Sequence, residues 1–408
     1  KVTQAAEQNW AITKDKFGVL WLGGEDNFVN RYDGTKWTKI LLDQNNPTIV
    51  RALAADENGI IYVGGNNQFG YIEPDSAGTR TYKSLKSRFT TASDITEKFL
   101  SDTSTIKLPA TSEITIGELK SLVIKDSIVY FLSDRTLIMY NKEVDRLSYV
   151  SLRALGFRQF ERIYLLNGRI ILANNRLGLL ELKDNKIILL PGGDFFKFKR
   201  CMAVFTYESE KIVVTTLDRG IFLFDCSTGM VDSSLLEKKL FKKLKEEFWT
   251  YSAVRLATGE MIFGTTDDGA YVFNASGKFI GHWTSDNLEM KDNVITTMYS
   301  DPSTCSELWI STTGSVTKAY VNLPFTQFSE KMGLLGSVST FCKFNDVVYA
   351  AADQGLFKSI TDEDGRRVFT LVNDINSQIF PLAVSKVERD SFLLAGSTFT
   401  GIYRINSN

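Results

Sequence analysis

Histidine is nearly absent from this chain, with His282 the single example among 408 residues. A histidine-based metal cluster is therefore excluded, because catalytic zinc sites draw on several such ligands. A Ser-His-Asp triad would have to use this one residue. We expect His282 to be structural or solvated, so enzymes that depend on histidine and a metal ion are disfavoured.

The chain also has few prolines and almost no net charge, and it lacks a membrane-spanning run and a closely spaced pair of cysteines. The sequence has seven prolines, a formal net charge of −1 and no apolar run near the roughly 20 residues of a membrane span. A near-neutral chain lacks the cationic footprint of a nucleic-acid-binding protein, so no nucleic acid is expected as a partner. Widely spaced cysteines without a CxxC pair predict buried free thiols rather than structural zinc: Cys201, Cys226, Cys305 and Cys342.

Phosphate-binding and calcium-binding loops are missing too. No GxxxxGK[ST] segment occurs. TTDDG at 265–269 and TDEDG at 361–365 lack the ligand series of a calcium loop, and Asp-Gly is typical of tight turns. We therefore expect no catalytic residue, no metal site and no cofactor.

Aromatic residues are abundant, at 12%, and they recur in a repeated pattern. FGVLWLGGEDNFVNRYDGTKW at 17–37 contains a turn glycine, an apolar run, Gly-Gly, a polar tip, a second run and an Asp-Gly turn. NGIIYVGGNNQFGYIEPDSAGTRTY at 58–82 repeats this order. Weaker copies occupy 127–141, 169–185, 211–225, 260–274, 307–321, 347–361 and 391–406. Most of these nine units are spaced by about 41 to 44 residues, the period of a four-stranded β-propeller blade.

The repeat predicts an all-β propeller of four-stranded antiparallel blades in a single domain over 1–408. One blade cannot bury both faces of its sheet, so blades stack around an axis. Nine units exceed the usual four to eight blades, which leaves seven or eight blades open. The last unit ends after its third strand, GIYRIN, and we expect residues 1–6 to supply the missing outer strand and latch the ring.

Two segments interrupt the repeat. A Ser/Thr-rich insertion at 86–116 has no periodicity and is either a surface loop or a lid over the axis. LLEKKLFKKLKEEF at 235–248 places apolar residues at helical spacing, which predicts a short amphipathic helix. Packing of this helix on its own blade and docking of a partner are both open.

The segments QNWAITKDKFGVLWLGG, NRYDG and IIYVGGNNQFGYIEPDSAG resemble two-component-regulator propeller repeats. Those repeats form the extracytoplasmic sensor regions of bacterial hybrid histidine kinases and of related triple-tyrosine-motif regulators. The resemblance implies a periplasmic ligand-sensing domain attached to a membrane span and an intracellular output module. It also implies a glycan-derived ligand. Units three to nine match the family only in pattern.

The candidate binding site follows from propeller geometry. Loops joining the second and third strands, and loops entering the first strand, emerge at the same end and surround the axis. Here they carry amide, guanidinium and aromatic groups, which suit sugars because ring faces stack and hydroxyls pair with fixed donors and acceptors. The same residue types fill hairpin tips in any β protein. The predicted ligand-binding residues are Trp10, Arg51, Asn67, Arg176, Arg200, Arg219 and Trp249.

We therefore expect a non-enzymatic sensor that binds a small molecule or oligosaccharide. A protein–protein interaction platform is an alternative and predicts a flat, exposed apolar patch. A carboxylate-based glycan-active enzyme is another and predicts two close carboxylates, one with a raised pKa. Homodimerisation is left open by the sequence.

Overall fold

The computed structural model describes residues 8–406 apart from 77, 100–115, 154, 158, 237–241, 243, 245–248, 322–327, 329, 363–366, 373–374 and 388–389. The described residues form nine β-sheets of three to five strands, and each repeat unit of the sequence forms one sheet. The prediction of an all-β fold built from small antiparallel sheets is therefore confirmed. Helical conformation in this part of the chain is limited to short 3-10 turns and a fragment at Lys242 and Leu244.

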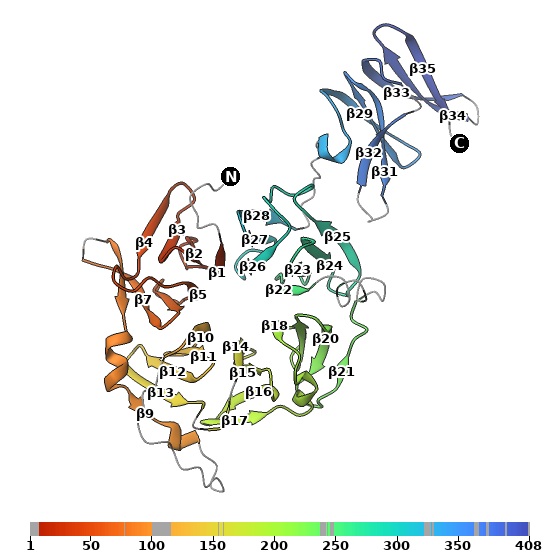
Figure 1. Cartoon of the computed structure of the whole chain (residues 1–408). Coiled ribbons are helices and arrows are strands. Elements are labelled where there is room, and N and C mark those ends of the chain that lie inside the picture. Colours follow the sequence, from red (N-terminus) through yellow and green to blue (C-terminus); the bar gives the residue numbers. More distant parts are fainter. Residues whose placement is uncertain are drawn as a thin grey trace. The chain divides into compact units, whose positions relative to one another are not determined.

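The first three sheets, each written from inner to outer strand, are built from the following elements (Figure 1). They are β1 (Asn9–Lys14), β2 (Leu20–Gly24), β3 (Phe28–Tyr32) and β4 (Trp37–Leu41); β5 (Val50–Ala55), β6 (Ile61–Gly65), β7 (Gln68–Pro74) and β8 (Arg80–Ser84); and β10 (Leu119–Lys125), β11 (Ile128–Ser133), β12 (Thr136–Asn141), β13 (Arg146–Ser151) and β9 (Ser93–Asp94). All pairings in them are antiparallel except that of β13 with β9.

The next four sheets continue the same order. They are β14 (Phe160–Leu166), β15 (Arg169–Asn174), β16 (Gly178–Lys183) and β17 (Lys186–Leu189); β18 (Cys201–Thr206), β19 (Lys211–Thr216), β20 (Gly220–Asp225) and β21 (Val231–Asp232); β22 (Thr250–Arg255), β23 (Met261–Thr265), β24 (Ala270–Phe273) and β25 (Phe279–Trp283); and β26 (Ile295–Ser300), β27 (Glu307–Thr312) and β28 (Val316–Tyr320). A 3-10 turn, η3 (Gly193–Phe196), connects β17 to β18.

The inner strands of these seven sheets contact one another in a closed cycle. Each of β1, β5, β10, β14, β18 and β22 contacts the inner strand that follows it, and β26 contacts β1. The first and seventh sheets, far apart in the sequence, therefore lie side by side, and the strands converge on a central axis (Figure 1). The ring closes after seven sheets, although the sequence contains nine repeat units.

The remaining two sheets belong to a separate compact unit. The chain divides into Lys1–Phe279 with Trp283–Val321, and Ile280–His282 with Asn322–Asn408. The single domain expected over 1–408 stays a prediction. The second unit contains η4 (Glu330–Met332), a sheet of β29 (Val338–Phe344), β30 (Val347–Ala352), β31 (Gly355–Thr361) and β32 (Arg367–Leu371), and a sheet of β33 (Ile379–Val387), β34 (Asp390–Ser397) and β35 (Gly401–Asn406).

The predicted latch concerns residues 1–6, which lie outside the described residues. GIYRIN, the strand that they were predicted to complete, is β35 of the second unit. Ring closure in the first unit instead involves β1 and the seventh sheet.

The turn after the first strand shows how the repeat folds locally. Asp15 Oδ1 accepts hydrogen bonds from the backbone N–H groups of Phe17 and Val19, and its Oδ2 accepts one from Trp21 Nε1 at 3.0 Å. Gly18 has φ +80°, a conformation that favours glycine. An Asp three residues before a Gly therefore fixes both the turn and the buried Trp21 ring.

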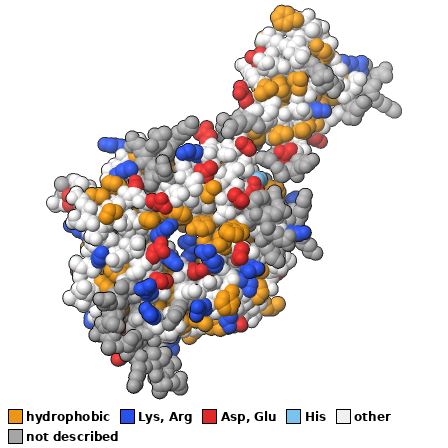
Figure 2. Space-filling view, viewed as in Figure 1, with side chains coloured by type: hydrophobic (Ala, Val, Ile, Leu, Met, Phe, Trp, Pro, Cys, Tyr) orange, Lys and Arg blue, Asp and Glu red, His pale blue; other side chains and the backbone are white. Residues whose placement is uncertain are grey.

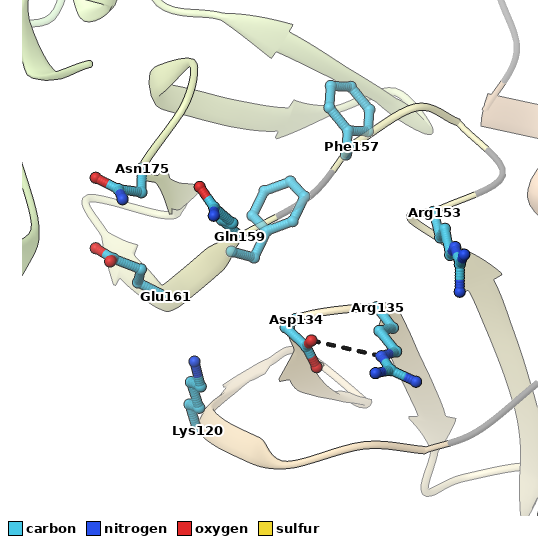
Figure 3. Close-up of a pocket in the computed structure, with 9 residues that line it drawn as sticks. Lys120, Asp134, Arg135, Arg153, Phe157, Gln159, Glu161 and Asn175 are labelled. Atoms are coloured by element: carbon cyan, nitrogen blue, oxygen red, sulfur yellow. Dashed lines mark ion pairs between the residues drawn. The ribbon is translucent and has the colours of Figure 1, made fainter. Parts of the chain in front are cut away.

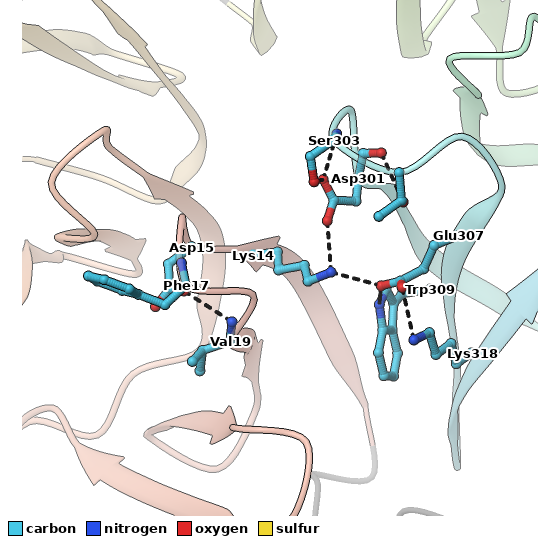
Figure 4. A network of polar contacts seen from close by, with 10 residues as sticks. Lys14, Asp15, Phe17, Val19, Asp301, Ser303, Glu307, Trp309 and Lys318 are labelled. Atoms are coloured by element: carbon cyan, nitrogen blue, oxygen red, sulfur yellow. Dashed lines mark hydrogen bonds and ion pairs between the residues drawn. The ribbon is translucent and has the colours of Figure 1, made fainter.

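A polar network joins the first sheet to the seventh (Figure 4). Lys14 Nζ, at the end of β1, donates to Asp301 Oδ2 at 2.7 Å and to Glu307 Oε1 at 3.0 Å. Glu307 also accepts from Trp309 Nε1 at 2.7 Å and pairs with Lys318 Nζ at 2.8 Å. Burial alone would raise the pKa of Glu307, but the hydrogen bonds from these partners outweigh it and lower the pKa. The network therefore favours the ionised carboxylate at the ring closure.

The two interrupting segments pack on the periphery where they are described. In the insertion, η1 (Lys86–Thr91) and η2 (Thr96–Phe99) flank β9, which extends the outer edge of the third sheet, and Phe89 and Phe99 are buried. Residues 100–115, which the lid hypothesis mainly concerns, lie outside the described residues. In the predicted helix 235–248, Leu236 and Leu244 are buried in a core cluster with Met261 and Phe273, which fits packing on its own blade.

The scarce residue types behave largely as expected. His282 is buried on β25, the outermost strand of the sixth sheet. All four cysteines are free, but only Cys201 and Cys226 are buried, whereas Cys305 is exposed and Cys342 is half-buried. The prediction of buried thiols is therefore wrong for two of the four.

Candidate functional site

A β-bulge interrupts every inner strand of the ring near its start. In β1, the pairing with β2 skips from Asn9 to Ala11, which leaves Trp10 unpaired. The same shift recurs in the other six inner strands. A bulge re-aims a side chain away from the regular alternation of a strand. The seven bulged residues are Trp10, Arg51, Lys120, Glu161, Met202, Tyr251 and Thr296.

All seven bulged residues line one cavity on the axis of the ring. Its volume is about 280 Å³, and the remaining lining residues are Glu118, Arg162, Arg200, Cys201, Ser252 and Thr297. Each of the seven sheets therefore contributes to a single site through the same structural position. Figure 2 shows basic and acidic side chains gathered at the centre of this face, with hydrophobic side chains beside them.

One side of this axial cavity is aromatic. The Arg51 guanidinium lies over the Trp10 ring, 4.3 Å from its centroid, and its Nε pairs with Glu118 Oε1 at 3.1 Å. The Trp10 and Tyr251 rings are 6.2 Å apart and tilted by 59°. Both rings are only half-buried, so they present planar surfaces to the cavity. Such surfaces, fixed by a cation and a carboxylate, can stack on an apolar ligand face.

The opposite side of the axial cavity is built around Glu161. Its side chain is only 18% exposed, and its Oε1 lies 3.6 Å from Arg200 Nε. Its Oε2 is buried and has no hydrogen-bond partner. Burial raises the pKa of Glu161, and the nearby charges of Arg200, Lys120 and Arg162 offset this effect only in part. The cavity therefore contains an acceptor oxygen that no protein donor satisfies.

A second cavity, of about 430 Å³, adjoins the first between the third and fourth sheets (Figure 3). Lys120 and Glu161 line both cavities. We call this second cavity the lateral groove. Its other lining residues are Asp134, Arg135, Arg153, Phe157, Gln159, Phe160 and Asn175. Asp134 and Arg135 form an ion pair at 3.5 Å, and Asn175 Oδ1 is buried without a partner. The shared residues make the two cavities one continuous concave site.

The structure brings three of the seven predicted site residues to the axial cavity: Trp10, Arg51 and Arg200. The other four lie outside its lining. Arg176 Nε donates to Gln159 of the lateral groove at 3.2 Å, and Asn67 bonds through its backbone N–H to Gly117, next to Glu118. Arg219 pairs with its neighbour Asp218 and is 59% exposed, and Trp249 is 54% exposed.

The residues that sequence reasoning missed share one signal. Lys120, Glu161 and Tyr251 each lie one position before the runs SLV, RIY and SAV of their inner strands, as Trp10 lies before AIT. Aligning the repeats places all of them in one column. Reading down that column gives seven of the thirteen residues that line the cavity, whereas selecting hairpin tips does not.

Replacing Glu161 with glutamine should raise the melting temperature at neutral pH. A carboxyl whose pKa is raised on folding disfavours the folded state once it is ionised. This penalty is absent below the unfolded pKa of about 4.3 and is complete above the higher folded pKa. The stability gain of the variant should therefore disappear as pH falls below about 4. Thermal melts from neutral pH to below pH 4 test whether the stability difference between Glu161→Gln and wild type has the predicted sign. Glu118→Gln is the control at a more exposed carboxylate. A Glu161→Gln variant less stable than wild type at neutral pH would contradict the raised pKa of Glu161.

Among solved structures, the chain is similar to extracellular regions of bacterial regulators. It matches the extracellular domain of the "putative hybrid two component system BT3049" from B. thetaiotaomicron with a TM-score of 0.66 and 14% identity, covering 99% of this chain and 52% of that one. The corresponding domain of the "putative hybrid two component system BT4673" gives 0.56 and 15%, covering 99% and 51%. The chain thus spans about half the length of these structures.

The WD40 β-propeller domain of Doa1 also matches, with a TM-score of 0.55 and 13% identity, covering 79% of this chain and 95% of that domain. No family model matches the sequence, and no curated protein does. At these identities the likeness establishes the fold, a β-propeller of the kind found in regulator extracellular domains. The resemblance inferred from the repeats is confirmed at that level.

Two further findings concern the described residues only. Among them, no helix is long and apolar enough to cross a membrane. Within the same residues, no group of three or more His, Cys, Asp or Glu side chains is arranged to hold a metal ion.

Proposed function

We propose that the seven-sheet ring is the ligand-binding part of an extracytoplasmic sensor domain of a bacterial one- or two-component regulator. It binds a small molecule or oligosaccharide in the axial cavity and does not transform it. The observation that carries the proposal is the convergence of seven bulged side chains, one from each sheet, on one polar and aromatic cavity. A site to which every blade contributes can link ligand binding to the geometry of the whole ring.

The chemistry of the cavity supports a sugar-like ligand. Trp10 and Tyr251 offer ring faces for the C–H face of a sugar. Arg51, Lys120 and Glu161 supply donors and an unsatisfied acceptor for hydroxyl groups. Few polar groups at fixed positions in a concave site are typical of small-molecule recognition.

We also propose a cellular location and attached domains for this chain, by analogy with the similar solved structures. BT3049 and BT4673 structures are described as extracellular domains of regulators, and this chain matches half of each. By analogy we place this chain in the periplasm, attached to a membrane span and an intracellular output module. The sensing event would then be transmitted from the ring to that module.

Replacing Trp10 with alanine should weaken ligand binding by roughly 10- to 100-fold, because one stacking ring contributes about 1–3 kcal/mol. Trp249→Ala is the matched control, since Trp249 is exposed and lies outside the cavity lining. Calorimetric titration with a panel of neutral and acidic oligosaccharides measures both variants. A loss of binding in Trp249→Ala with none in Trp10→Ala would place the site at the rim instead.

A carboxylate-based glycan-active enzyme has one specific observation in its favour. The axial cavity holds two carboxylates, Glu118 and Glu161, and the pKa of Glu161 is raised by burial, as in general acids of glycosidases. Chromatography of the ligand recovered after long incubation separates the two functions. The sensor proposal predicts unchanged oligosaccharide, whereas cleavage products that vanish in Glu161→Gln would establish catalysis.

A protein-interaction role is supported by exposed apolar side chains in the second unit. There Phe399 and Ile402 are 82% and 74% exposed on and next to β35. Exposed apolar side chains that lie close together are typical of contact surfaces. Such a role is compatible with ligand binding in the ring, because the two features lie in different units.

A further inference from the structure

The charges around Glu161 do not balance. Burial raises the pKa of Glu161 against the influence of three cations, Arg200, Lys120 and Arg162. All three line the axial cavity with it. The other cation and carboxylate of the cavity, Arg51 and Glu118, are paired with each other at 3.1 Å. Three positive charges therefore face a single negative charge.

Two of these cations lack a salt-bridge partner. Within the described part of the chain, neither the Lys120 ammonium nor the Arg162 guanidinium has a carboxylate within 4.0 Å. Both side chains are half-buried, so water screens them less than it screens a surface lysine. Figure 3 shows the Lys120 amine on the strand facing Glu161, at the place where the two cavities join.

We propose that the ligand of this site is anionic and that its carboxylate or sulfate group binds between Lys120 and Arg162. The inference rests on the proposed ligand-binding function and specifies the chemical class: an acidic sugar, such as a uronate or a sulfated unit, within a short oligosaccharide. The negative group supplies the charge that the protein omits, and charge-assisted hydrogen bonds to it are about twice as strong as neutral ones.

Glu161 has a distinct part in this arrangement. Its buried Oε2 can accept a hydrogen bond from a sugar hydroxyl, because no group among the described residues donates to it. A carboxylate next to the cations also rejects a ligand that places a negative group too deep in the cavity. Lys120 and Arg162 therefore select an acidic group at one position of the ligand, and Glu161 selects a hydroxyl at the adjacent position.

The lateral groove extends the same preference. Besides Lys120 and Glu161, the groove is lined by Arg135 and Arg153 and by one further carboxylate, Asp134, which is already paired with Arg135. Phe157 lies across the groove from Asp134 and Arg135 and offers a ring face (Figure 3). An oligosaccharide that enters the axial cavity past Lys120 would place its next unit in this groove, so two neighbouring acidic units could both be matched.

The experiment compares matched pairs of probes by calorimetry on the whole chain. Uronate-containing disaccharides are titrated beside their carboxyl-reduced counterparts, and sulfated disaccharides beside their desulfated counterparts. We expect an acidic probe to bind at least about 10-fold tighter than its neutral counterpart, since a hydrogen bond to a charged group contributes about 1.5–3 kcal/mol. The two series distinguish carboxylate from sulfate. The preference should shrink as salt rises from about 0.05 M to about 0.5 M.

Variants of Lys120 and Arg162 test whether the preference for acidic probes arises at these two residues. Lys120→Met and Arg162→Gln should each reduce the acidic-over-neutral preference by about 10-fold, because each weakens binding of the acidic probe more than binding of its neutral counterpart. Lys186→Met is the control, because Lys186 is an exposed strand lysine on the outer edge of the sheet that carries Glu161. Equal binding of neutral and acidic probes would overturn the inference while leaving the proposed function intact. Absence of binding by every probe would count against the proposed function itself.

Discussion

Replacing Gly264 with valine should destabilise the ring by about 3 kcal/mol, at the upper end of the usual cost of overpacking. Gly264 lies on β23 and faces Ile295, the first residue of the next inner strand. A Cβ at position 264 would lie 2.5 Å from Ile295 Cγ2 and 2.9 Å from Ile295 Cβ. Neighbouring sheets would have to move apart, and the closed cycle of inner strands leaves little room for that.

A double-mutant cycle tests whether this close approach is the cause. Ile295→Ala removes the opposing side chain and should by itself cost about 2–4 kcal/mol as a cavity-forming change. If the two residues conflict, Gly264→Val with Ile295→Ala should be less destabilised than the sum of the single changes, by about 1 kcal/mol or more. Urea unfolding measures all three variants. Strict additivity would mean that the sheets do not meet at this point.

Replacing Glu307 with alanine should destabilise the ring by about 3 kcal/mol, because it removes the carboxylate that two lysines and an indole N–H share and leaves Lys14 with Asp301 alone. Lys14 and Lys318 both pair with Glu307, and Trp309 Nε1 donates to it. Glu307 is only 9% exposed, so water cannot readily replace these contacts. Lys14 comes from the first sheet and Lys318 from the seventh, so the loss falls on the ring closure.

The pH dependence of this network gives an independent check. Burial would raise the pKa of Asp301, but hydrogen bonds from Lys14 and Ser303 outweigh it, and the pKa of Glu307 is likewise lowered. Carboxyls of this kind stabilise the fold above their unfolded pKa of about 4, and the contribution is lost as pH falls through the folded values. The difference between wild type and Glu307→Gln should therefore be full at pH 7 and should shrink as pH falls below about 4. Glu208→Ala, at an exposed pair with Lys211, should change stability by less than about 1 kcal/mol.

The sheets could be predicted from the sequence because each sheet is specified by residues that lie close together in the chain. Each blade needs a short apolar run, a turn residue and a second run, and the Asp15 turn with Gly18 shows the physical reason. The number of blades in the ring is not local. It depends on the angle between packed sheets, and therefore on contacts such as Gly264 with Ile295, which no single repeat reveals. Nine units were counted correctly, yet the ring closes at seven and the last two units separate.

The candidate site was predicted only in part for a related reason. Trp10, Arg51 and Arg200 were chosen as polar or aromatic residues near the ends of strands, and they reach the axial cavity. Arg219, predicted from a hairpin tip, and Trp249, predicted from the entry to an inner strand, lie outside the cavity lining. Trp10 and Arg51 occupy the bulge, a shift in strand register that turns one side chain per blade toward the axis, whereas Arg200 lines the cavity from the residue before β18. Register depends on pairing between strands, so it becomes visible only in the structure.

The most direct test of the central claim is a crystal structure of the chain bound to the tightest-binding oligosaccharide of the panel. We expect density for the sugar in the axial cavity, stacked on Trp10 or Tyr251, with its acidic group against Lys120 and Arg162 and a hydroxyl against Glu161. Density confined to the rim residues Arg219 and Trp249, or to the second unit, would contradict the claim that the bulged residues of the seven sheets form the binding site.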